Sequence, residues 1–256
     1  MKYQHDNSKT IERGLGGCMT SFQSSIVRNL PVYQEPPEEY LRNWQNILYK
    51  RLIRQGYQMR DDTKPGIEKA VNCFAAWQIH DISVSVHKRQ DDQPVYKPPK
   101  GFILCGGVGT GKTTLLKILA EPTKPERDGD SYFIRYRGAV CVSITDLVGS
   151  LLMDGRDFAE KFAKRYQKNV LIIDDLGQEG DMQYYGTKIS KFVELIIERR
   201  YQFFERTGAM TVFATNLQPA DLETFYDART VSRLSAMIGA TSGIVPFNGA
   251  DWRKRA

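Results

Sequence analysis

The sequence predicts an α/β protein: a parallel five-stranded sheet with flanking helices, preceded by a small α-helical module. The first observation behind this prediction is the alternation of strand-like and helix-like segments from about residue 101 onward. Such alternation is typical of a parallel sheet covered by helices on both faces. The second observation is a glycine-rich loop between the first strand and the first helix of this region. The expected strands are 101–105, 139–144, 169–174, 210–215 and 243–247.

Composition excludes several classes of protein. The apolar content of 41% and charged content of 26% are ordinary for a soluble globular chain. No apolar run approaches the length of a membrane span, and the N-terminus lacks the apolar core of a secretion signal, so we expect a cytoplasmic protein with no membrane partner. Four scattered cysteines and three histidines predict no disulfide framework, zinc site or histidine-based metal centre. The net charge of +6 favours contact with nucleic acid, although a generic basic surface also explains it.

The chain is predicted to have four parts. Residues 1–33 are polar and form an arm, and residues 34–87 carry two amphipathic helical patterns that form a partner-binding module. The first of these helices begins at Pro36-Pro37-Glu38-Glu39, since proline and acids favour the first helical turn. Residues 88–100 contain three prolines and few apolar side chains, which indicates a linker. Residues 101–256 form the sheet domain.

The glycine-rich loop fits the pattern Gly-x-x-x-x-Gly-Lys-Ser/Thr without departure. It follows the apolar run Phe102–Cys105 and precedes the helix-like run Leu115–Ala120, which is the context that this motif requires. Its glycines let backbone N–H groups surround an anion, and the helix start adds a partial positive charge. We therefore predict that the loop binds a nucleoside triphosphate, with Lys112 on the β- and γ-phosphates and Thr113 on Mg²⁺. The predicted nucleotide-binding residues are Gly106, Gly107, Val108, Gly109, Thr110, Gly111, Lys112, Thr113 and Thr114.

Polar residues follow two of the later strands. The β-branched run 169–173 ends in Asp174 and Asp175, and the strand at 210–215 ends in Asn216. Ligands of open α/β sheets bind at the carboxyl ends of the strands, beside the phosphate loop. Asp174 is thus predicted to hold Mg²⁺, Asp175 to orient or deprotonate the attacking water, and Asn216 to hold that water. The alternative is a capped turn after each strand, since Asp and Asn favour turns.

Helical patterns lie on either side of the strand at 210–215. The pattern near 187–206 has one apolar stripe and stops at Gly208. Arg229 and Arg233 are four residues apart on one face of a later helix. A guanidinium donated by a neighbouring subunit can stabilise charge on the transferring phosphoryl group. The alternative is a solvated basic helix face.

The order and spacing of these motifs resemble the AAA+ ATPases. More narrowly, they resemble the bacterial and phage replicative-helicase loader family (DnaC-like) and the related IstB-type transposition helpers. The resemblance spans roughly residues 98 to 256 and is carried by residues 106–113, 170–177, 211–217, 229–234 and 247–253. It implies that Lys112 and Thr113 are the Walker A pair, Asp174 and Asp175 the Walker B pair and Asn216 sensor 1. It also implies that Arg229 is a trans-acting arginine finger accompanied by Arg233.

The resemblance has further consequences for fold and rate. Only 256 − 233 = 23 residues follow Arg233, so no C-terminal lid domain is expected, and Arg253 is a candidate replacement for the sensor 2 arginine that a lid would carry. Many AAA+ proteins have glutamate where Asp175 stands, and a shorter acid predicts slow hydrolysis.

The function that the resemblance implies is ATP-dependent loading of a hexameric replicative helicase onto single-stranded DNA. The N-terminal module would bind the helicase, and subunits would assemble side by side with ATP and Mg²⁺ at their interfaces. Basic residues suited to DNA lie in one helix-like stretch: Arg156, Lys161, Lys164, Arg165 and Lys168. Three alternatives remain open: a helper of a transposase in target-site delivery, a small-molecule kinase, and a nucleotide-gated adaptor that does not hydrolyse.

Overall fold

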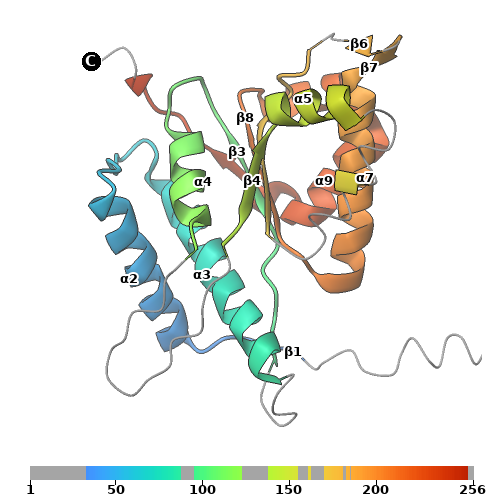
Figure 1. Cartoon of the computed structure of the whole chain (residues 1–256). Helices are drawn as coiled ribbons and strands as arrows, with labels where there is room; N and C mark the ends of the chain where they lie inside the picture. Colours follow the sequence, from blue (N-terminus) through green and yellow to red (C-terminus); the bar gives the residue numbers. More distant parts are fainter. Residues whose placement is uncertain are drawn as a thin grey trace, which may run out of the picture.

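The computed structural model describes residues 33–87, 95–122, 138–154, 161–162, 170–180, 183–184 and 186–252. Its centre is a five-stranded sheet in the order β4-β5-β8-β3-β9, and every neighbouring pair is parallel (Figure 1). The strands are β3 (Phe102–Cys105), β4 (Val140–Ser143), β5 (Leu171–Leu176), β8 (Thr211–Thr215) and β9 (Ile244–Pro246). This confirms the predicted fold class, and each strand lies within two residues of its expected bounds.

The apolar strands divide their side chains between two cores. In β3, Phe102 and Leu104 belong to one buried cluster, whereas Ile103 and Cys105 belong to the other. This follows from the strand geometry, in which successive side chains point to opposite faces. Both faces of a central parallel strand are buried, so such strands read as continuous apolar runs.

Helices cover both faces of the sheet (Figure 1). One face packs against α2 (Glu38–Arg54), α3 (Lys64–His87) and α4 (Lys112–Ala120). The other packs against α5 (Ile144–Asp154), α7 (Ile189–Thr207), α8 (Pro219–Phe225) and α9 (Ala228–Ile238). The remaining elements are β1 (Tyr33–Gln34), β2 (Val95–Tyr96), β6 (Gln183–Tyr184), β7 (Thr187–Lys188) and η2 (Ala240–Gly243).

The N-terminal helices share the core of the sheet. The α2 helix begins after Pro37 with two acids in its first turn, and a turn that contains Gly56, with φ of +71°, follows its end. Leu52 of α2 and Phe74 of α3 are completely buried in the same cluster as β3. The rings of Phe74 and Phe102 meet edge to face with centroids 6.4 Å apart. The α2–α3 pair is therefore held against the sheet by apolar packing.

Several predicted features lie outside the described residues. These are the arm at 1–32, most of the linker at 88–94, and the basic residues Arg156, Lys164, Arg165, Lys168 and Arg253. Among the described helices, none has the length and apolarity that crossing a membrane requires.

Candidate functional site

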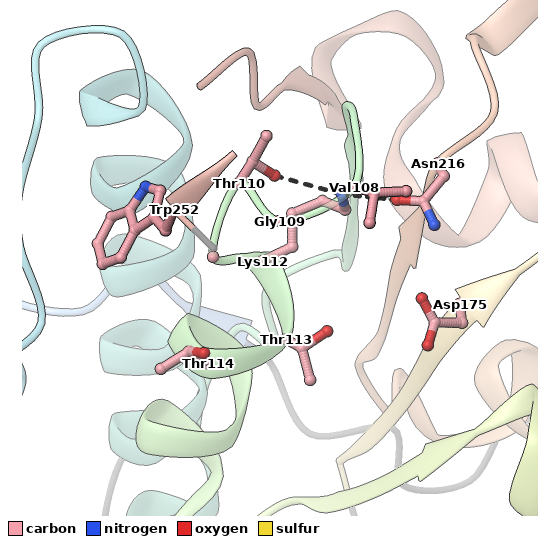
Figure 2. Close-up of a pocket in the computed structure, with 10 residues that line it drawn as sticks. Val108, Gly109, Thr110, Lys112, Thr113, Thr114, Asp175, Asn216 and Trp252 are labelled. Carbon is pink, nitrogen blue, oxygen red and sulfur yellow. Dashed lines mark hydrogen bonds between the residues drawn. The ribbon is translucent and has the colours of Figure 1, made fainter. Parts of the chain in front are cut away.

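A pocket opens at the carboxyl ends of β3, β5 and β8 (Figure 2). It brings together most of the predicted site residues, although these come from three separate parts of the chain. Its lining residues are Val108, Gly109, Thr110, Gly111, Lys112, Thr113, Thr114, Asp175, Asn216 and Trp252. Trp252 is the one lining residue that the motifs did not predict.

The loop between β3 and α4 depends on glycine at two points. Gly109 and Gly111 have φ of +76° and +96°, a region that residues with a Cβ rarely adopt. Gly111 is the residue that precedes α4, and among the described residues no side chain caps this helix. The first N–H groups of α4 are therefore available to an anion, and the helix dipole favours negative charge there.

Lys112 is a buried cation bonded to neutral oxygens. It is 6% exposed, and its Nζ donates to Gly106 O at 2.7 Å, Gly107 O at 2.8 Å and Asn216 Oδ1 at 3.0 Å. Burial lowers the pKa of Lys112, while the nearby charges of Asp174 and Asp175 act in the opposite direction. In the part of the chain that the structure describes, no carboxylate makes an ion pair with Lys112. A phosphate is a stronger partner than a carbonyl for a desolvated ammonium group, so this arrangement favours anion binding.

The end of β5 contains an irregularity that separates the two acids. The pairing of β5 with β8 shifts register between Ile173 and Leu176, and Asp175 has φ of +58°. An extra residue in one strand re-aims side chains, and such bulges are frequent beside active sites. Asp174 stays buried at 2% exposure, whereas Asp175 lines the pocket. The two neighbouring carboxylates thus occupy different environments.

Asp174 and Thr113 form the oxygen pair expected for a magnesium site. Burial raises the pKa of Asp174, and a hydrogen bond with the Thr113 hydroxyl acts in the opposite direction. The backbone N–H of Asp175 donates to Asp174 Oδ1 at 3.0 Å. Carboxylate and hydroxyl oxygens are hard ligands that suit Mg²⁺, and a buried carboxylate is stabilised by a cation. The residues present therefore fit a magnesium ion that would be held by Thr113 and Asp174.

Asn216 is fixed at the end of β8 by its neighbour. Thr215 Oγ1 donates to Leu176 O at 2.6 Å and accepts from Leu217 N at 3.0 Å. These bonds tie the end of β8 to the residue that follows the bulge in β5. Asn216 consequently faces the pocket and accepts from Lys112 (Figure 2).

The two predicted arginines do not line this pocket. The Arg229 side chain is 73% exposed, and its Nη2 lies 3.6 Å from Glu198 Oε1. The Arg233 side chain is 13% exposed, donates to the same Glu198 oxygen at 3.0 Å and lies over the Tyr201 ring. The structure therefore places Arg233 as a contact between α9 and α7, and places Arg229 on the surface.

The sheet domain matches a family model and is similar to a curated protein. Residues 102–234, more than half of the 256 residues, match the family model "ATPase family associated with various cellular activities (AAA)". The chain is 28% identical over 152 residues to the 26S proteasome regulatory subunit 4 homolog of Saccharomyces cerevisiae. This match covers 54% of the chain and 32% of the yeast protein, so the chain spans about a third of that relative's length.

Two solved structures are similar to this chain at low sequence identity. The crystal structure of the DnaI is 18% identical with a TM-score of 0.45, over 84% of this chain and 93% of that one. The crystal structure of the DnaC helicase loader is 20% identical with a TM-score of 0.38, over 64% of this chain and 86% of that one.

Proposed function

We propose that this chain, which belongs to the AAA ATPase family, is an ATP-dependent loader that delivers a hexameric replicative helicase onto single-stranded DNA. Family membership implies nucleotide binding and supports an ATPase. The observation that carries the proposal is the pocket in which buried Lys112 joins the glycine-rich loop to Asn216, opposite Asp175. The narrower loader function rests on the motif resemblance, on the basic charge of the chain and on the surface position of Arg229.

The proposed chemistry assigns one role to each polar group. Lys112 and the first N–H groups of α4 bind the β- and γ-phosphates, which replace the neutral oxygens around Nζ. Asp175 orients the attacking water and accepts its proton, and Asn216 holds that water in line. Mg²⁺, held by Thr113 and Asp174, would supply positive charge to the phosphate oxygens when bound.

The position of Arg229 supports side-by-side assembly. Its side chain is exposed on α9 and does not reach the pocket of its own chain. In the proposed assembly it would contact the nucleotide of a neighbouring subunit, and ATP would hold the two subunits together. Arg233, bonded to Glu198, would keep α9 in the position that this contact requires.

The experiment that tests the loader function is co-elution of the full chain with the replicative helicase of the same organism. Deletion of the N-terminal helices is not a suitable test, because α2 and α3 share a core with the sheet. The deletion would expose Phe102 and Leu104. A point substitution is better: Ile53→Glu on α2, whose side chain is among the exposed apolar ones at 61%. The matched control is Met153→Glu on α5, where the residue is 90% exposed.

Co-elution in ATP that is lost in Lys112→Ala and in Ile53→Glu, but kept in Met153→Glu, supports the loader function and α2 as the binding surface. Separate elution in all nucleotide conditions would reject the helicase as partner. A transposase would then become the next partner to purify.

A further inference from the structure

We propose that Trp252 forms the nucleoside end of the pocket and that its indole ring stacks on the base of the bound nucleotide. This inference rests on the proposed nucleotide site and extends it. It also assigns a function to the C-terminal segment at residues 247–252, which lies against the phosphate loop.

The layout of the pocket identifies which end holds the base. Figure 2 shows Trp252 and Thr114 on one side of Thr113, with Asp175 and Asn216 on the other. The acid and the amide mark the end where the terminal phosphate would lie. A nucleotide that runs along the loop therefore leaves its base at the opposite end, where Trp252 offers an aromatic ring.

The chain holds Trp252 in this position through its backbone. The N–H of Trp252 donates to Gly109 O at 3.0 Å, and the N–H of Phe247 donates to Cys105 O at 2.7 Å. Asp251 approaches the loop so closely that a Cβ on Gly109 would lie 1.7 Å from its Oδ1. The segment thus contacts the end of β3 through Phe247 and the loop through Asp251 and Trp252.

The ring of Tyr57 packs against the ring of Trp252. The two rings are tilted by 40° with centroids 5.5 Å apart, and Tyr57 is 5% exposed. The Tyr57 hydroxyl lies 3.3 Å from Gly111 O, to which it donates. Tyr57 follows α2, and a Cβ added to Gly111 would lie 3.2 Å from the Tyr57 hydroxyl and 3.8 Å from the Trp252 ring, so both aromatic residues lie beside Gly111. Trp252 is the more exposed of the two rings and lines the pocket.

The indole N–H gives a second reason to assign a ligand here. Trp252 Nε1 is buried and has no acceptor among the described residues. A buried Trp N–H usually finds a partner, because an unpaired donor destabilises the folded state. The ring can therefore move toward a bound base without breaking a hydrogen bond, and such a movement would let its N–H donate to the nucleoside.

Calorimetric titration with ATP and with inorganic triphosphate separates base contact from phosphate contact. Aromatic stacking on a base is worth about 1–3 kcal/mol, so Trp252→Ala should weaken ATP binding roughly tenfold or more. The same variant should bind inorganic triphosphate like the unaltered protein. Trp252→Phe keeps a ring and should recover most of the ATP affinity. Lys112→Ala should weaken both ligands.

Intrinsic fluorescence gives an independent readout, because the chain has three tryptophans and the other two are Trp44 and Trp77. ATP should change the emission of the unaltered protein and of the matched control Trp44→Phe, and should leave that of Trp252→Phe unchanged.

Two results would overturn the inference while leaving the nucleotide site intact. One is unchanged ATP affinity in Trp252→Ala beside lost affinity in Lys112→Ala. The other is an equal loss of ATP and inorganic triphosphate in Trp252→Ala, which would show that the ring only supports the loop. Unchanged binding of both ligands in Lys112→Ala would instead reject the nucleotide site itself.

Discussion

Asp175→Asn should stop ATP hydrolysis without disturbing the fold or the binding of nucleotide. The backbone of Asp175 is in the left-handed region, with φ of +58°, and Asp and Asn are the residues with a Cβ that tolerate it best. Its backbone contacts, N–H to Asp174 Oδ1 and C=O to Gln178 N, do not involve its side chain. The substitution keeps the shape of the side chain and removes only its ability to accept a proton.

The expected size of each effect follows from these contacts. Removal of a general base lowers the rate by about 10²–10⁴, which is roughly 2.7–5.5 kcal/mol of activation free energy. The free energy of unfolding should change by less than about 0.5 kcal/mol, because no packing or hydrogen bond of the backbone is lost. The dissociation constant for ATP should stay within about twofold, since Lys112 and the loop are untouched.

The hydrolysis rate is measured as phosphate release with single-stranded DNA present. Calorimetry gives the dissociation constant for ATP, and thermal unfolding gives the change in stability. Asp175→Glu is the informative companion, because it keeps a carboxylate but fits the left-handed backbone poorly. It should lower the melting temperature by about 2–4 °C, the equivalent of about 1 kcal/mol. Hydrolysis by Asp175→Asn at the original rate would show that another group activates the water. A large loss of stability in Asp175→Asn would show that the Asp175 carboxylate stabilises the bulge in β5.

Substitutions at three further positions test the surroundings of the site. Burial raises the pKa of Asp174 in the folded protein, because the protonated carboxyl is the form that tolerates burial. The contribution of Asp174 to folding stability is therefore full below the unfolded-state pKa of about 4, where the group is protonated, and is lost as the pH rises through the folded-state pKa. Without nucleotide or Mg²⁺, Asp174→Asn should therefore melt above the unaltered protein at pH 7, with a smaller difference near pH 4; a lower melting temperature at pH 7 would contradict this. Glu179 is fully buried and accepts from the Tyr226 hydroxyl and from Gly177 N, so Glu179→Ala should reduce stability by about 1–3 kcal/mol and Glu179→Gln by less. Equal melting temperatures of the two variants would refute that account. Arg229→Ala should retain ATP binding and lose roughly 10³-fold in DNA-stimulated hydrolysis, whereas full activity would assign the finger to another residue.

The strands and the phosphate loop were predictable because their signals are local. Strand patterns such as Phe102–Cys105 need only consecutive apolar residues, and the loop motif is contiguous in sequence. The pairing of β1 with β2 was not predictable, because strands of two residues have no period to detect. Val95 of β2 is 3% exposed, although it lies in the segment that composition indicated as a linker.

The residues of the site were predictable where they belong to one contiguous motif, and they were not predictable where they depend on contacts between distant segments. The bulge at Asp175 arises from the pairing of β5 with β8, and no residue type in the sequence announces it. Tyr57 lies in the connection between α2 and α3, far in sequence from Trp252, and the two meet only because this connection and the C-terminal segment both pack beside the loop. The sequence did contain one signal, an aromatic residue between Asp251 and a basic residue near the chain end. The sequence alone does not show that this residue, Trp252, lies beside the pocket, because that position depends on the fold.

The buried pair of Glu179 and Tyr226 connects the acid end of the pocket to the helix that carries Arg229. Gly177 and Glu179 lie in the turn that follows β5, and the Tyr226 hydroxyl donates to Glu179 across the core. The next residue, Asp227, is the N-cap of α9, and its side chain accepts from Thr230 N at 2.8 Å. A movement of the Asp175 backbone would therefore displace a turn whose Glu179 is bonded to Tyr226, the residue before the N-cap of α9. Because an unpaired group in that core is unfavourable, the turn and the helix should move together, which would make the position of Arg229 sensitive to the nucleotide in its own chain.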